Sequence, residues 1–161
     1  MNAVARAISA PATVMLKGWA LLAMDGLTLA LPQKDIVTIE LTTVLQPAEH
    51  GGSEVGWLEQ NEQRWPIYGI DQHCALVPTL AESARVCMLF RSEQRILGLA
   101  GMKVTLLAAD ADLSTSPLPA CLTRPGSPLV GLALRGEVIV AIAHAQALTD
   151  YLVSLEVVHG D

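Results

Sequence analysis

The sequence predicts a mainly β protein folded as one small barrel or as a pair of small barrels. Nine or ten short strand patterns follow one another at regular spacing, and turn residues bound each of them. Strands and helices do not alternate as they would in a parallel α/β sheet, and one clear helical pattern stands near the C-terminal end. Barrel closure removes exposed strand edges, so two barrel-like halves account for this many strands in 161 residues.

The clearest predicted hairpin lies near the start of the chain. Residues 19–24 form an apolar run, and the dipeptide Asp25-Gly26 that follows is a strong two-residue turn signal. Residues 27–31 then alternate between apolar and polar or small side chains until Pro32, which ends the strand pattern. We therefore expect two antiparallel neighbours at this point.

Residues 36–42 form the next predicted strand, because the run is rich in β-branched side chains. Its polar residues Thr38, Glu40 and Thr42 share one parity, and successive side chains of a strand point to opposite faces. We expect this polar side to face water and the apolar side to face the core.

A second hairpin is predicted from strands at 55–58 and 64–68, joined by the polar turn 59–63. Two of the three tryptophans, Trp57 and Trp65, flank this turn. They either fill the core, since the chain has one phenylalanine, or form an exposed aromatic anchor for a partner. We favour the core interpretation.

The strand pattern lapses between residues 71 and 83, where we expect a short connecting helix or an irregular segment. Two further strands are predicted at 85–90 and 95–107. Gly98 and Gly101 interrupt the second of these strands and indicate a bulge or a tight bend, as barrels need at their corners.

The last part of the chain repeats the strand, turn and strand order of the second hairpin. A loop rich in Pro, Ser and Thr spans residues 110–128 and is expected to contain an edge strand near 120–123. A hairpin follows, with strands at 129–134 and 138–143. Apolar residues then recur at helical spacing from residue 145 to about residue 158, which predicts an amphipathic terminal helix.

Composition excludes several classes of function. The net charge is −6, and the ten Lys and Arg residues form no run or stripe, so the chain is not expected to bind nucleic acid. The mean hydropathy is high, at +0.42. No apolar stretch approaches the ~20 residues that a spanning helix needs, so we expect no direct insertion into a membrane.

The three cysteines, Cys74, Cys87 and Cys121, are odd in number and widely spaced, which fits neither a disulfide framework nor a paired metal site. We expect reduced, small core residues and a cytoplasmic location. Residues 1–15 lack the apolar segment of a signal peptide and are interpreted as an N-terminal arm. Residues 16–161 are expected to form a single domain of two intimately packed halves.

Several segments together resemble a known family. Residues 22–32 followed by 36–39 resemble the opening of CheW-like coupling domains, in which a strand pair precedes a Val-x-Glu-Ile type of segment. Residues 55–58 with 66–70 resemble the family's Gly-hairpin-Pro-Val-Ile-Asp-Leu element. Residues 96–104 resemble its Gly-Leu-x-Val-Asp-x-Val strand. The match is one of pattern and order, and it extends over most of the chain.

This resemblance implies two five-stranded barrel-like halves, a short connecting helix and a C-terminal helix. It also implies a non-enzymatic adaptor of bacterial chemosensory signal transduction. Domains of this family bridge chemoreceptors to the regulatory domain of a histidine kinase and require no cofactor and no metal. A homo-oligomer with a buried apolar surface is an alternative that the sequence leaves open.

The resemblance carries over to the binding residues only in part. Thr38 stands where the family commonly has Glu, Asn61-Glu62 stands in place of an Arg-Gly turn, and Gly69 replaces an Asp. These departures fall on the family's contact surfaces rather than on its core. The residues predicted to bind a partner are Ile36, Thr38, Ile39, Asn61, Glu62 and Arg64.

A rival interpretation is a β-barrel that binds a small molecule or catalyses a reaction in a pocket near Asp71, His73 and His144. An acid/base pair of His144 with a carboxylate would serve such a site, but the sequence contains no nucleophile elbow, P-loop or dinucleotide fingerprint. The pair His73-Cys74 lacks further ligands at metal-binding spacing. An isolated carboxylate pair at Asp110 and Asp112 is typical of a solvated loop.

Overall fold

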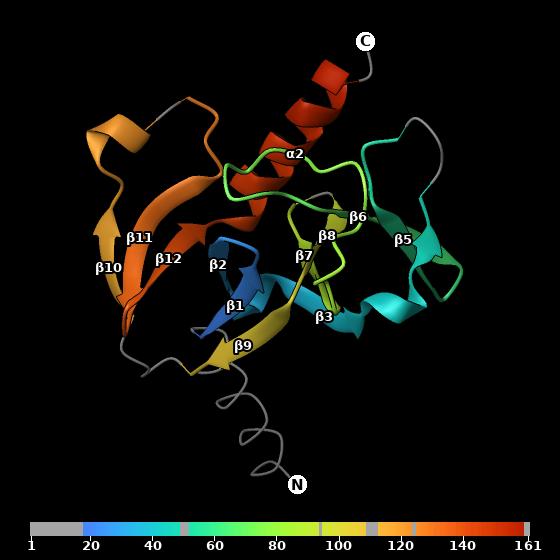
Figure 1. Ribbon diagram of the computed structural model, residues 1–161, viewed down its shortest axis with the longest axis horizontal. Helices are drawn as coiled ribbons and strands as arrows, with labels where there is room; N and C mark the ends of the chain where they lie inside the picture. Colours follow the sequence, from blue (N-terminus) through green and yellow to red (C-terminus); the bar gives the residue numbers. More distant parts are fainter. Residues whose placement is uncertain (1–17, 49–51, 94, 109–112, 124, 160–161) are drawn as a thin grey trace, which may run out of the picture.

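The computed structural model describes residues 18–48, 52–93, 95–108, 113–123 and 125–159. The expected N-terminal arm lies outside these residues, and so does the carboxylate pair Asp110 and Asp112. Two six-stranded sheets make up the described part, and one α-helix follows the last strand (Figure 1). The mainly β prediction is confirmed.

The first sheet has the strand order β10-β11-β12-β2-β1-β9. All of its neighbouring strands are antiparallel except β12 and β2, which run parallel. Its strands in chain order are β1 (Trp19–Met24), β2 (Leu27–Pro32), β9 (Lys103–Leu107), β10 (Ser114–Pro117), β11 (Leu129–Arg135) and β12 (Val138–Ala143).

The second sheet repeats this arrangement in the order β4-β5-β6-β8-β7-β3, with β6 and β8 as its parallel pair. Its strands are β3 (Ile36–Leu41), β4 (Gln46–Pro47), β5 (Gly56–Gln60), β6 (Gln63–Tyr68), β7 (Val86–Arg91) and β8 (Ile96–Gly101). Each sheet thus joins two antiparallel three-stranded groups through one parallel contact. The internal repeat of the sequence is therefore a structural repeat as well.

Each half approaches a five-stranded barrel because its two edge strands belong to one bent segment. β3 pairs with β7, and after the short 3-10 turn η2 (Thr42–Val44) the chain continues as β4, which pairs with β5 at the opposite edge. Counted as one strand, β3 and β4 leave five strands in this half. β9 and β10 stand in the same relation to β1 and β11 in the other half.

The second half is inserted into the first. The strands β3 to β8 are consecutive in the chain and form the second sheet, whereas the first sheet combines β1 and β2 with β9 to β12. The first half is therefore discontinuous in sequence. The turn η1 (Gln33–Asp35) carries the chain across, and the Gln33 side-chain amide donates to the carbonyls of Trp19 and Leu107 at 3.1 and 3.0 Å.

Three apolar clusters fill the structure. One lies within each half, and the third and largest lies between the two sheets, where alternate residues of β1, β2, β7 and β8 meet. The helix α2 (Ala145–His159) covers this central cluster with Ala145, Leu148 and Leu152, which are fully or almost fully buried. Two barrel-like halves packed on a common core explain the high apolar content of so small a chain.

Three elements differ in detail from the sequence prediction. The short connecting helix is absent, and the segment 71–85 is irregular, as the other expectation had it, with an isolated bridge between Ile70 and Leu76. The predicted strand 95–107 divides into β8 and β9 immediately after Gly101, where an added Cβ would lie 2.8 Å from the Ala23 carbonyl oxygen. The edge strand of the late loop is β10 at 114–117, and residues 120–122 form the 3-10 turn η3 instead.

Candidate partner-binding surface

The exposed and half-buried sides of the strand β3 are the reverse of those predicted. Val37, Ile39 and Leu41 are the exposed residues, at 38%, 37% and 59%, whereas Thr38 and Glu40 are half-buried. The reason is the register with β7. Thr38 and Glu40 lie opposite Leu89 and Cys87, which face the core of the second half. The expectation that the polar side faces water is therefore wrong.

A bulge next to Val37 separates the two ends of β3. The register with β7 shifts between Ile36 and Thr38, so Ile36 pairs with Phe90 and packs against the central core. Ile36 is half-buried and Ile39 is exposed. Of the two predicted apolar contacts on this strand, Ile39 alone has an exposed side chain.

Glu40 joins β3 to the hairpin β5–β6. Its Oε1 atom accepts hydrogen bonds from the Thr38 hydroxyl and from the Gln60 side-chain amide, both at 3.0 Å. The sheet order places β7, β8 and β6 between β3 and β5. This contact therefore spans the open side of the barrel and places the predicted β3 residues close to the predicted turn residues.

The turn of the hairpin β5–β6 is strained at one position. Asn61 and Glu62 have φ values of +51° and +64°, which are typical of a type I′ turn. Asn tolerates the left-handed region, but Glu adopts it at a cost of about 1 kcal/mol. Both side chains are exposed at the tip of the hairpin.

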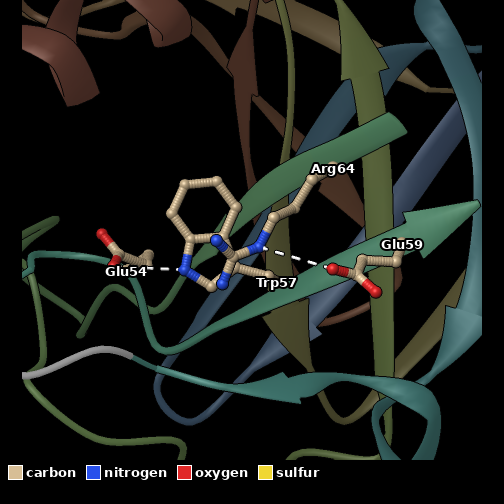
Figure 2. A network of polar contacts seen from close by, with 4 residues as sticks. All are labelled: Glu54, Trp57, Glu59 and Arg64. Carbon is tan, nitrogen blue, oxygen red and sulfur yellow. Dashed lines mark hydrogen bonds and ion pairs between the residues drawn. The ribbon is translucent and has the colours of Figure 1, made fainter. Parts of the chain in front are cut away.

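Arg64 belongs to a small polar cluster on the outer face of the same hairpin (Figure 2). Its guanidinium carbon lies 4.2 Å from the centre of the Trp57 ring, and its Nε atom lies 3.8 Å from a Glu59 carboxylate oxygen. The Trp57 indole N–H in turn donates to Glu54 at 3.3 Å, and Glu54 is buried. A cation-π contact and a carboxylate thus hold Arg64 against the hairpin.

The two tryptophans of this hairpin have different environments. Trp65 packs against the core of the second half, as the core interpretation expects. Trp57 is half-buried on the opposite face, beneath Arg64. Trp57 lies opposite Pro66, the residue next to Trp65, so the two tryptophans point to opposite faces of the hairpin.

Sequence reasoning missed three exposed apolar residues next to the predicted ones, Val37, Leu41 and Val44. Leu41 and Val44 extend the exposed row of Val37 and Ile39 into the turn η2, and Val44 is 49% exposed. The β-branched run indicated a strand at this position. Which of its two alternating sets of side chains faces outward depends on the pairing of the strand with β7. We use the name β3 surface for Val37, Ile39, Leu41 and Val44.

The residues of the rival pocket do not come together. Asp71 and His73 line one cleft of about 400 Å³, whereas His144 lines a different hollow beside Arg91 and Glu93. The Asp71 carboxylate accepts the backbone N–H groups of His73 at 2.8 Å and of Ala75 at 3.0 Å, so it shapes the loop. The predicted grouping of all three residues is wrong for His144.

The neighbouring thiol is not activated. Burial, with a smaller contribution from the Asp71 charge, raises the pKa of Cys74 above its ordinary value. The Cys74 carbonyl accepts a hydrogen bond from the Tyr151 hydroxyl at 2.6 Å, which ties the loop to α2. Within the described residues, no group of three His, Cys, Asp or Glu side chains could hold a metal ion.

The cysteines differ in their exposure. Cys87 is fully buried, Cys74 is half-buried and Cys121 is exposed, so Cys121 is not the core residue that was expected. All three are free thiols. Burial raises the pKa of Cys87 to about 11.

The two barrel-like β halves and the helix that follows them form a CheW-like fold. The chain is similar in structure to the scaffolding protein TtCheW from Thermoanaerobacter tengcongensis, with a TM-score of 0.61. The similarity covers 80% of this chain and 89% of that one at 14% sequence identity. This likeness establishes the fold.

Sequence comparisons add no further relative, since no protein-family model and no curated protein sequence matches the chain. No helix in the described part of the chain is long and apolar enough to cross a membrane. The likeness to TtCheW is therefore one of three-dimensional structure.

Proposed function

We propose that the chain is a non-enzymatic adaptor of bacterial chemosensory-type signal transduction that acts in the cytoplasm. Its partners are the regulatory domain of a histidine kinase, a chemoreceptor-like protein, or both. The likeness to a scaffolding protein over most of both chains supports this role. The adaptor needs no cofactor, because its function is to hold partners at its surface.

The β3 surface carries the proposal. Three apolar side chains, Val37, Ile39 and Leu41, are exposed on a strand that pairs with β7 alone among the described strands. Exposed apolar rows of this kind are typical of protein interaction sites, since they gain stability when a partner removes them from water. Ile36 supports this strand from the core side and contributes to binding only indirectly.

The hairpin turn supplies the polar rim. Asn61, Glu62 and Arg64 are exposed, and the bond between Gln60 and Glu40 holds the turn near β3. Thr38 contributes by fixing the Glu40 carboxylate rather than by touching a partner. An apolar centre with polar groups at its edge is the usual composition of a protein interface.

The test is a binding measurement with purified partners from the same bacterium. The regulatory domain of the kinase and the signalling tip of a receptor are titrated against the adaptor by biolayer interferometry. Ile39→Asp and Leu41→Asp, each in the β3 surface, are expected to weaken binding at least tenfold, because each buries a charge in the interface.

The matched control is Val130→Asp, which places the same charge on a strand residue of similar exposure, 42%, in the other half. It is expected to bind as the wild type does. Circular dichroism spectra and melting temperatures establish that all variants are folded. Unchanged binding by both β3 variants, or no binding of either partner to the wild type, contradicts the proposal.

A further inference from the structure

Arginines cluster at one surface hollow in a protein whose net charge is −6. The hollow has a volume of about 690 Å³ and lies where the start of β6 meets the turn between β7 and β8. Arg64, Arg91 and Arg95 line it together with one carboxylate, Glu93. With the Glu59 carboxylate that lies 3.8 Å from Arg64 counted as well, three positive charges meet two negative charges, so the hollow is locally basic.

Ser92 and Glu93, which follow Arg91, are held in place by hydrogen bonds. The backbone N–H of Ser92 donates to the carbonyl of Arg95 at 3.0 Å, and Ser92 is buried. The Glu93 N–H donates to the Gln146 side chain at 3.1 Å, which ties the turn to α2. A fixed backbone reduces the entropy lost when a ligand is bound.

The walls of the hollow are partly apolar. Trp65 and Ile96 line it, and both are half-buried against the core of the second half. Arg91 lies opposite Ile96 in the β7–β8 ladder, so a guanidinium and an aliphatic side chain stand side by side. Arginine and tryptophan around a desolvated centre are the composition of strong protein interaction sites.

These features favour an acidic peptide over a nucleic acid. Guanidinium groups bind carboxylates through two parallel hydrogen bonds, and the apolar wall fits one aliphatic side chain between two carboxylates. A polyphosphate backbone would meet Glu93 here and a net negative charge elsewhere on the protein. Arg64 already pairs with Glu59, so the specific carboxylate contacts fall to Arg91 and Arg95.

We infer that the hollow between β6 and the β7–β8 turn binds an acidic peptide segment of a protein partner, through Arg91 and Arg95. It is a second binding surface, because neither arginine belongs to the β3 surface. The inference does not depend on the proposed coupling role. A peptide with glutamates on either side of a leucine is the simplest ligand with this chemistry.

The experiment uses the full chain labelled with ¹⁵N and two synthetic peptides, Gly-Glu-Leu-Glu-Gly and its Gln counterpart. Chemical shifts of the backbone amides and of the arginine Nε–H groups are followed during titration. The acidic peptide is expected to give saturable shifts at Arg91 and Arg95, and the neutral peptide is not. Raising the salt concentration is expected to weaken binding, because exposed charges are screened.

The variant Arg91→Gln/Arg95→Gln is expected to bind the acidic peptide at least tenfold more weakly, since charge-assisted hydrogen bonds are lost. Arg91→Lys/Arg95→Lys keeps the charge without the planar guanidinium. Its affinity for the acidic peptide is expected to lie between those of the wild type and the glutamine variant. The matched control is Arg85→Gln/Arg135→Gln, which removes the same charge from two exposed arginines elsewhere.

Three results would overturn the inference. One is shifts that do not saturate or are equal for the two peptides. Another is equal loss of affinity in both glutamine pairs, which would show a general effect of charge. A third is tighter binding of a single-stranded oligonucleotide at the same arginines. Failure of the β3 variants to change partner binding would leave this result untouched, so the two proposals fail separately.

Discussion

The Gln60 side-chain amide donates a 3.0 Å hydrogen bond to the Glu40 carboxylate, although three strands separate β5 from β3 in the sheet. The bond joins β3 to β5 before the chain bends from β3 into β4. At this point side chains, rather than a backbone ladder, close the second half. The same carboxylate accepts the Thr38 hydroxyl, so one acidic group holds both predicted contact segments.

Gln60→Ala is therefore expected to lower the free energy of unfolding by about 1 kcal/mol, the usual net value of a part-exposed bond to a charged acceptor. Urea denaturation measures this change. Gln63→Ala, at the paired position of the same hairpin but exposed, is the control and should stay within about 0.5 kcal/mol of the wild type. Equal losses in the two variants would show that the Glu40 bond contributes nothing.

Glu62→Gly is expected to stabilise the protein by about 1 kcal/mol. Glu62 has a φ of +64°, and glycine adopts this conformation without the steric cost of a Cβ atom. Thermal and urea unfolding report the gain. Glu62→Ala removes the charge but keeps the Cβ atom, so a comparable gain in this variant would refute the conformational explanation.

Thr149→Val is expected to raise stability by about 1 kcal/mol or more. Thr149 is 3% exposed, and its hydroxyl finds no hydrogen-bond partner in the described part of the protein. An unsatisfied buried hydroxyl is costly, and valine has the same shape without it. Thr149→Ala leaves a small cavity instead and should not stabilise, which separates the polar effect from packing.

Cys87 is expected to make stability fall with rising pH between about 9 and about 11. The thiol releases its proton near 9.0 when unfolded, but burial raises its pKa to about 11 in the folded protein. In this window the folded state binds more protons, so stability decreases as pH increases. Urea midpoints from pH 8 to 11 test this, and the decrease should be smaller in Cys87→Ala.

Thiol labelling gives an independent check of the same burial. Cys121 is exposed and should react with a thiol reagent within minutes at pH 8, whereas Cys87 should react only after unfolding. Rapid labelling of Cys87 in the folded protein would contradict its buried position.

Much of the fold could be predicted because it depends on local signals. Asp25-Gly26 and the turn at 135–137 mark hairpins through backbone geometry, and Gly26 and Gly136 indeed have φ values of +80° and +64°. The helical spacing from residue 145 likewise reports the face that α2 buries. The order of these signals was sufficient to indicate two related halves.

The binding surface could be predicted only in outline. The alternation of residues 36–42 into two sets of side chains was visible in the sequence. Which set faces outward depended on the pairing of β3 with β7 and on the bulge beside Val37. A one-residue change of register moves every side chain to the opposite face, and no local preference determines it. The separation of His144 from Asp71 is another long-range result of this kind.

The sequence by itself determined the strands, the hairpin turns and the C-terminal helix, because these follow from the periodicity of apolar residues and from turn chemistry. The tertiary structure alone decided that β3 to β8 form one half inserted between β2 and β9 of the other, that Val37, Ile39 and Leu41 face outward, and that Arg64, Arg91 and Arg95 share one hollow. The physical reason is that strand pairing and packing join residues far apart in the chain, and only their combined burial selects one register over another.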